Sequence, residues 1–340
     1  MRANIQQISQ ATGFSPATVS NALNHKKGVR ADTAAKILGA AESMGYFENA
    51  RVSAVRFVQF KSTGQIVGER PFFAEVISGV EQECRARGYE VYMTTLSRDE
   101  ADYDSRLEQI LSDTSCGVIL LATEAGEADM TRFAEARAPL LLLDNWPEQT
   151  PCDALLISNT DSACHAVQYL AHLGHREIGY LKCSYRIKNF FYRQEGYRRA
   201  LELEGLLFHP EWEVEVPADA EAVWHALEAW LDTSPALPTA FFADNDNIAV
   251  GALKAFASRG IRVPEDVSVV GFDDLAFTAF STPPLTTVHV PKIELGRMAV
   301  RLLLDKIDSS VRAPLKTQIC TTFIERESVR ALTSRRRPAR

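Results

Sequence analysis

The stretch of sequence that decides the fold of the first domain is residues 5–24, IQQISQATGFSPATVSNALN. Its first apolar residues recur at helical spacing up to Gly13, so we expect a short helix that ends at this glycine. Ser15 and Pro16 are residue types preferred at a helix N-cap and at the first helical position. They predict a second helix over residues 16–23.

A third helix is predicted from about Asp32 to Gly45, where apolar residues again recur at helical spacing. Three short helices joined by a tight, glycine-containing turn indicate an all-α helix-turn-helix domain. We place this DNA-binding domain at residues 1–48 and a shortened hinge or linker at residues 49–55.

The charge of the chain is divided unevenly along its 340 residues. Residues 1–56 hold seven Lys or Arg and three Asp or Glu, a net charge of +4. Residues 326–340 carry a net charge of +5, which leaves −16 for the middle of a chain whose total is −7. A basic head on an acidic body favours contact between the head and a polyanion such as DNA. The basic tail, residues 331–340, is either disordered or a second DNA contact.

Composition excludes several classes of protein. Hydrophobic residues at 46% and charged residues at 24% are typical of a globular protein, not of a disordered or fibrous chain. No apolar run approaches the roughly 18 residues of a membrane span, and the first residues lack an apolar signal segment. We therefore expect a cytoplasmic protein. The six cysteines include no C-x-x-C pair, so we expect no metal site and no cofactor.

From residue 55 onward, strands and amphipathic helices alternate. Strands are predicted at 55–60, 89–93, 117–121, 140–143, around 157, and at 178–181, 240–242, 267–270, 286–290 and 318–324. Helices are predicted at 73–87, 103–111, 130–136, 161–173, 192–204, 220–232, 247–258 and 293–307. Apolar strands separated by such helices indicate doubly wound parallel sheets covered on both faces. We predict two lobes within residues 56–330: the first from 56–157 and 287–316, the second from 158–285 and 318–328.

Motifs of common enzymes are missing from this α/β region. The first strand is not followed by G-x-G-x-x-G, and the sequence has no phosphate-binding G-x-x-x-x-G-K-[ST], no H-E-x-x-H and no G-x-S-x-G. We therefore predict a binding module without catalytic residues. Doubly wound sheets bind ligands at the carboxyl ends of their strands.

Polar residues stand at these strand ends. Asp144 and Trp146 follow one predicted strand, Asn245 follows another, and Asp273 follows a third. Carboxylates and amides beside aromatic rings suit a ligand rich in hydroxyl groups. A helix cap is the alternative for any single Asp, but the repetition at three strand ends favours a binding site.

The sequence also resembles the LacI family of transcriptional regulators, from residue 3 to about residue 330. The resemblance lies in residues 5–24 and in GV (28–29), IL (37–38), GY (45–46), FFAE (72–75), LGHREI (173–178), EGY (195–197), ADND (243–246), VPEDVSVVGFDD (263–274), PPLTT (283–287) and ERESV (325–329). It implies a helix-turn-helix head and a periplasmic-binding-protein-like effector domain. It also implies a homodimer on a pseudopalindromic operator in double-stranded DNA, with the second helix in the major groove.

The resemblance assigns DNA contacts residue by residue. Pro16, Ala17, Ser20 and Asn21 match the base-facing positions, and Ser15, Thr18 and Asn24 suit phosphate contacts. Many members of the family have Arg where this chain has Asn21. Because Arg favours guanine and Asn can pair with adenine, we expect a different operator base at that step.

Effector contacts are implied in the same way. The matching positions are Phe72, Phe73, Asp144, Trp146, Asn189, Arg193, Asn245 and Asp273. Arg193 lies where the family clamps ligand oxygens with a guanidinium group. The expected effector is a sugar or sugar derivative, with a purine-like heterocycle as the alternative. A solute-binding protein of the same fold is the alternative function. The resemblance implies a repressor whose effector acts by changing the angle between the lobes.

The linker departs from the family pattern. Glu48 stands where the family has a proline, and the leucine that enters the minor groove has no clear counterpart, since Val52 and Val55 are poor substitutes. We therefore expect no ordinary hinge helix with a leucine wedge.

Overall fold

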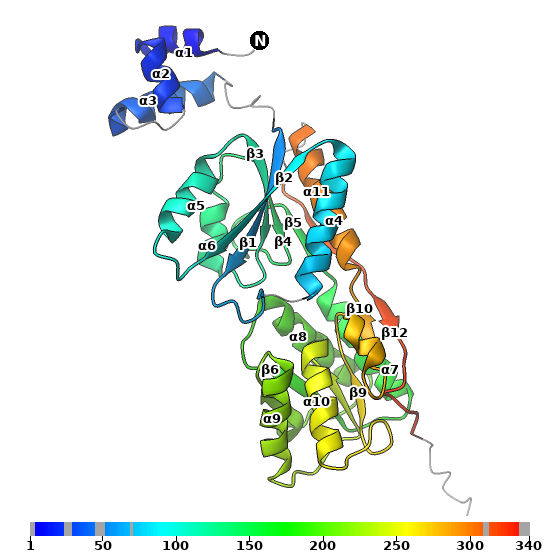
Figure 1. Cartoon of the computed structure of the whole chain (residues 1–340). Coiled ribbons are helices and arrows are strands. Elements are labelled where there is room, and N and C mark those ends of the chain that lie inside the picture. Colours follow the sequence, from blue (N-terminus) through cyan, green and yellow to red (C-terminus); the bar gives the residue numbers. More distant parts are fainter. Residues whose placement is uncertain (1–3, 24–28, 45–51, 69–70, 309–312, 333–340) are drawn as a thin grey trace, which may run out of the picture.

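The computed structural model describes residues 4–23, 29–44, 52–68, 71–308 and 313–332. It shows three helices followed by two α/β lobes placed end to end (Figure 1). The predicted hinge lies partly outside the described residues, as does most of the basic tail. Val52 and Val55 are described, and both are buried.

The head consists of α1 (Ile5–Thr12), α2 (Pro16–Leu23) and α3 (Ala31–Ser43). Asn4 and Gln7 form a reciprocal capping box at the start of α1, and Gly13 ends the helix with a left-handed φ of 74°. A small core of Ile8, Val19, Ala22, Ile37 and Ala41 holds the three helices together. The predicted helix-turn-helix is confirmed.

The first lobe is built on a six-stranded parallel sheet. Its strand order is β11-β5-β4-β3-β1-β2, with β1 (Ala54–Lys61), β2 (Glu90–Ser97), β3 (Cys116–Leu121), β4 (Leu140–Leu143), β5 (Ala154–Ile157) and β11 (Lys316–Ile319). Helices α4 (Pro71–Arg87) and α11 (Lys292–Asp308) cover one face, and α5 (Tyr103–Ser112) and α6 (Glu127–Phe133) cover the other (Figure 1).

The second lobe has a four-stranded parallel sheet in the order β7-β6-β8-β9. Its strands are β6 (Ile178–Cys183), β7 (Glu213–Val216), β8 (Ala240–Ala243) and β9 (Ser268–Val270), and its helices are α7 (Asn159–His172), α8 (Lys188–Leu203), α9 (Ala220–Leu231) and α10 (Asp246–Ser258). Two short 3-10 helices, Pro210–Trp212 and Ala276–Phe280, complete it. The central strands β6 and β8 are almost wholly buried, as expected for a sheet covered on both faces.

The chain passes between the lobes after β5, after β10 (Thr287–His289) and after β11. The single strand predicted at residues 318–324 is wrong. It is two strands, because β11 pairs with β5 in the first lobe, while β12 (Thr322–Ile324) pairs antiparallel with β10. The lobe boundary predicted at 316–318 therefore falls inside β11. The alternating edge strand β7 was not predicted, since its sequence EVEV lacks an apolar run.

Two glycines bring α4 and α11 into backbone contact. A Cβ on Gly79 would collide with the carbonyl oxygen of Ile293, and a Cβ on Gly296 would collide with that of Val76. Only glycine fits at such a crossing. The two helices are thereby fixed against each other, and α4 places Phe72 and Phe73 at the boundary between the lobes.

Candidate functional site

The carboxyl ends of strands from both lobes face a single cleft. Seven of the eight predicted effector residues line it: Phe72, Phe73, Asp144, Asn189, Arg193, Asn245 and Asp273. Trp146 is not among the lining residues; its ring stacks on Tyr192 instead. The cleft has a cavity volume of about 40 Å³, enough for only a few water molecules.

Arg193 is buried, and each of its three guanidinium nitrogens has a polar partner. Its Nε donates to Oδ1 of Asn159 at 2.9 Å, and its Nη1 donates to the carbonyl oxygen of Asp244 at 2.6 Å. Its Nη2 lies 3.2 Å from Oδ1 of Asp273, and its guanidinium carbon lies 3.7 Å from the ring centroid of Phe272. These contacts fix the guanidinium plane before any ligand arrives, which is the preorganisation that a binding site requires.

Asp144 is the carboxylate that the first lobe contributes. Its φ of 69° is left-handed, a strained conformation of the kind that clusters at ligand clamps. Oδ2 accepts a hydrogen bond from the Thr123 hydroxyl at 2.8 Å, and a hydrogen bond from the Asn189 side chain also favours the charged form of this carboxylate. Burial raises the pKa of Asp144 to about 6, against the opposing effect of the Thr123 hydrogen bond.

Asp273 is the matching carboxylate of the second lobe. It and Asp274 both have positive φ values, 113° and 53°. The buried Lys292, at the start of α11, donates from Nζ to the carbonyl oxygens of Asp273 at 2.8 Å and Asp274 at 3.0 Å. Arg326 and His289 hold the Asp274 side chain. The strained turn is therefore held by partners from several segments.

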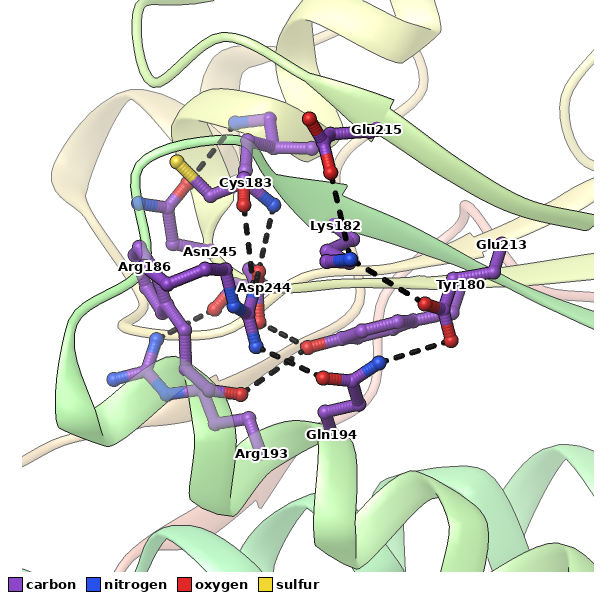
Figure 2. Close-up of polar contacts among 12 residues, drawn as sticks. Tyr180, Lys182, Cys183, Arg186, Arg193, Gln194, Glu213, Glu215, Asp244 and Asn245 are labelled. Carbon is purple, nitrogen blue, oxygen red and sulfur yellow. Dashed lines mark hydrogen bonds and ion pairs between the residues drawn. The ribbon is translucent and has the colours of Figure 1, made fainter.

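Asp244 organises the second-lobe wall behind the cleft (Figure 2). This fully buried carboxylate accepts hydrogen bonds from the Tyr180 hydroxyl, the Arg186 guanidinium and the backbone N–H of Cys183. Burial raises its pKa, and the charge of Arg186 opposes that effect. The network joins β6, the loop after it and the end of β8, and two of the cleft-lining residues, Ile187 and Asn245, are next in sequence to Arg186 and Asp244.

Seven lining residues lie outside the predicted set of effector contacts: Ile66, Thr123, Ile157, Ile187, Phe190, Asn247 and Leu275. Asn247 could have been found, because it follows a strand end that was already singled out. The apolar residues carry no such signal, since an apolar residue near a strand end is usually part of a core.

Glu124 holds the loop that carries Ile66. Its buried carboxylate accepts five backbone N–H groups at 2.7–3.0 Å, from Ser62, Thr63, Gly64, Ile66 and Val67. Burial raises its pKa, but the backbone hydrogen bonds outweigh burial, and the net pKa is lowered. The loop over residues 62–67 is therefore shaped by one charged side chain, 57 to 62 positions away.

The second helix of the head presents the predicted DNA contacts. Pro16 and Ala17 are exposed and Ser20 and Asn21 are partly exposed, while Val19 and Ala22 face the core. Ser15 caps the helix by accepting the N–H of Thr18 at 3.2 Å, and the hydroxyls of these two residues also interact. Asn24 lies outside the described residues.

Other kinds of site find no support in the described ranges. Within them, no three His, Cys, Asp or Glu side chains gather as a metal site. None of the described helices has the length and apolarity to cross a membrane.

A helix-turn-helix head joined to a two-lobed ligand-binding domain defines a DNA-binding regulator controlled by a small effector. Residues 4–49 match the model for bacterial regulatory proteins of the lacI family, and residues 167–329 match a periplasmic binding protein-like domain. The chain belongs to the LacI family.

Known relatives match nearly the whole chain. The HTH-type transcriptional repressor PurR of Haemophilus influenzae (strain PittEE) is 31% identical over 97% of this chain and 99% of its own length. PurR of Pasteurella multocida (strain Pm70) is 29% identical over the same shares. These relatives are transcriptional repressors.

Solved structures agree on the fold. A complex of the transcriptional regulator CelR with cellobiose has a TM-score of 0.73 and 26% identity, covering 96% of this chain and 100% of its own. The lac repressor dimer bound to operator and the anti-inducer ONPF has a TM-score of 0.72 at 23% identity, covering 97% of this chain and 100% of its own.

Proposed function

We propose that this chain is a transcriptional repressor whose effector binds between the lobes, on the seven lining residues predicted from the sequence. The observation that carries this proposal is the convergence on one cleft of Asp144 from the first lobe with the paired Arg193 and Asp273 from the second lobe. The burial of the Asp144 carboxylate supports it, because a buried charged group is destabilising unless polar partners such as the hydroxyls of a ligand satisfy it.

The effector best supported by these groups is a neutral molecule with several hydroxyl groups, such as a sugar. Two carboxylates and one guanidinium leave the cleft with excess negative charge, which disfavours a phosphorylated ligand. Carboxylates accept hydrogen bonds from hydroxyls, and the rings of Phe72 and Phe73 cover apolar faces. The similarity to a regulator solved with cellobiose supports this class. The PurR relatives support the purine-like heterocycle as the second candidate.

The DNA partner is an operator read by α2. Pro16, Ala17, Ser20 and Asn21 face the bases in this proposal, with Ser15, Thr18 and Asn24 at the phosphates. Affinity falls steeply with salt, because phosphate neutralisation releases counterions. Binding to DNA places the protein in the cytoplasm.

A homodimer presents two heads to a two-fold operator. Its support is exposed apolar surface on both lobes: Tyr92 and Met93 on the edge strand β2 are 46% and 44% exposed, and Phe280 is 87% exposed. An effector that changes the angle between the lobes changes the spacing of the heads, and thus the affinity for the operator.

The test combines a gel shift on DNA upstream of the gene with a thermal-shift panel. The panel contains D-glucose, D-ribose, cellobiose, glucose 6-phosphate, hypoxanthine and guanine. We expect a specific DNA shift that changes with a neutral sugar, which also raises Tm. Stabilisation by the purines alone would select the second candidate, and failure to bind any DNA would refute the repressor proposal.

A further inference from the structure

Trp146, Lys188 and Tyr192 lie beside the cleft without lining it. Trp146 follows β4 in the first lobe, whereas Lys188 and Tyr192 are on α8 in the second lobe. Each is one or two positions from a residue that does line the cleft. The same segments therefore present one set of side chains to the cleft and another set to its border.

These three side chains join the lobes through several contacts. The rings of Trp146 and Tyr192 stack with centroids 5.0 Å apart and planes at 29°. Nζ of Lys188 lies 4.3 Å from the Trp146 ring centroid and donates to the Trp146 carbonyl oxygen at 2.8 Å. The same Nζ lies 3.3 Å from Oε1 of Glu148. All these contacts cross from one lobe to the other.

The stability of helix α8 does not explain why a lysine stands at position 188. Lys188 is the first residue of the 16-residue helix α8. A cation there is unfavourable, because the N-terminal end of a helix carries partial positive charge. Its compensating partners are the Trp146 ring, the Trp146 carbonyl and Glu148, all in the first lobe. Lys188 therefore destabilises helix α8 taken alone but stabilises the closed arrangement of the two lobes.

Opening of the cleft must break these contacts. None of the three residues is in a segment that passes between the lobes, so no covalent connection keeps them together when the lobes separate. Small-molecule sites usually measure about 300–1,000 Å³. A cavity of about 40 Å³ is too small for a sugar, and the lobes must separate to admit one.

We propose that Trp146, Lys188 and Tyr192 form a latch that sets the balance between closed and open lobes and so controls access to the effector cleft. The control of effector access rests on the proposed function. The latch itself rests on the contacts between the lobes.

The experiment measures the distance between the lobes without DNA or effector. Spin labels are placed on exposed positions, through Glu135→Cys in the first lobe and Glu202→Cys in the second, in a Cys320→Ser background that removes the exposed native cysteine. Pulsed electron paramagnetic resonance then gives the distribution of distances between the labels. Because it uses no effector, the measurement stands even if the effector class is wrong.

We expect the Lys188→Ala/Tyr192→Ala variant to raise the ratio of long to short distances by about tenfold, from the loss of one aromatic pair and one cation–ring contact. Tyr192→Phe keeps the stacked ring and should keep the original distribution. Arg199→Ala is the matched control, because it removes an α8 ion pair with Asp161 that lies within the second lobe. An unchanged distribution in the double variant overturns the latch, as does an original protein that already shows mainly long distances.

Discussion

Replacing Glu124 by Gln tests how one carboxylate shapes the first-lobe wall. The two oxygens of Glu124 divide five backbone donors between them: Oε1 accepts two, from Ile66 and Val67, and Oε2 accepts three, from residues 62–64. Gln keeps one accepting oxygen and puts an NH₂ group in place of the other. At least two backbone N–H groups then face another donor.

The magnitude follows from these donors. A buried donor left without a partner costs about 1–3 kcal/mol, and the remaining hydrogen bonds lose the contribution of the negative charge. Water can reach the partly exposed residues 62–64, which lowers the total. We therefore expect the loop to lose about 3 kcal/mol of local stability, equivalent to a roughly hundredfold rise in its opening constant.

Hydrogen exchange of the backbone amides at residues 62–67 measures this constant directly. At pH 7, Glu124→Gln should speed exchange there by about a hundredfold and leave the second lobe unchanged. The pKa of Glu124 is lowered in the folded protein. Its contribution to the stability of the loop is therefore present above the ordinary pKa of 4.5 and is lost as the pH falls through the folded-state pKa. The difference between the two proteins should therefore shrink in acid.

The matched control is Glu127→Gln, which changes an exposed carboxylate that accepts backbone N–H groups of Glu148 and Gln149. It should leave the exchange of residues 62–67 unchanged. A change of less than tenfold in Glu124→Gln at pH 7 would refute the reasoning, because the backbone donors would then be satisfied without the charge.

Three further predictions concern the cleft and the head. Arg193→Lys keeps the positive charge but loses the planar set of guanidinium N–H donors. Operator binding should persist in a gel shift, while any effector response found in the panel should weaken at least tenfold. An unchanged response would show that Arg193 is not part of the effector site. Burial raises the pKa of Asp144 to about 6, so its ionisation destabilises the fold as the pH rises through that value. Asp144→Asn should therefore raise Tm by a few degrees at pH 8 and not at pH 4, and equal shifts at both would contradict this origin. Asn21→Ala should alter the preferred base at one operator position in a binding selection, and an unchanged preference would exclude Asn21 as a base contact.

Features that depend on short stretches of sequence were predictable. Gly13 and Ser15 mark the turn between the first two helices, because the required φ and the cap depend on the residues themselves. Asp144, Asn245 and Asp273 could be grouped because parallel strands bring their carboxyl ends to one edge.

Features that depend on distant partners were not predictable in this way. Trp146 is two positions after Asp144, which lines the cleft, but its ring packs on Tyr192 of the other lobe. This orientation depends on packing between the lobes. Glu124 gave no signal, because its five donors lie about sixty positions earlier in the chain. The division of residues 318–324 into two strands likewise depends on two different pairing partners, β5 and β10.

The glycine crossing of α4 and α11 has a mechanical consequence. The backbones of α4 and α11 are in contact at Gly79 and Gly296 and cannot slide past each other without collision. The helix pair therefore moves as one rigid unit, a beam in the mechanical sense. Phe72 is near one end of this beam, and the other end lies toward the first strand that follows the head. If the helix pair rotates slightly about its end at the cleft, its far end is displaced by a distance that grows in proportion to the length of the helices. Amplification of this kind needs no rearrangement of side chains inside the first lobe.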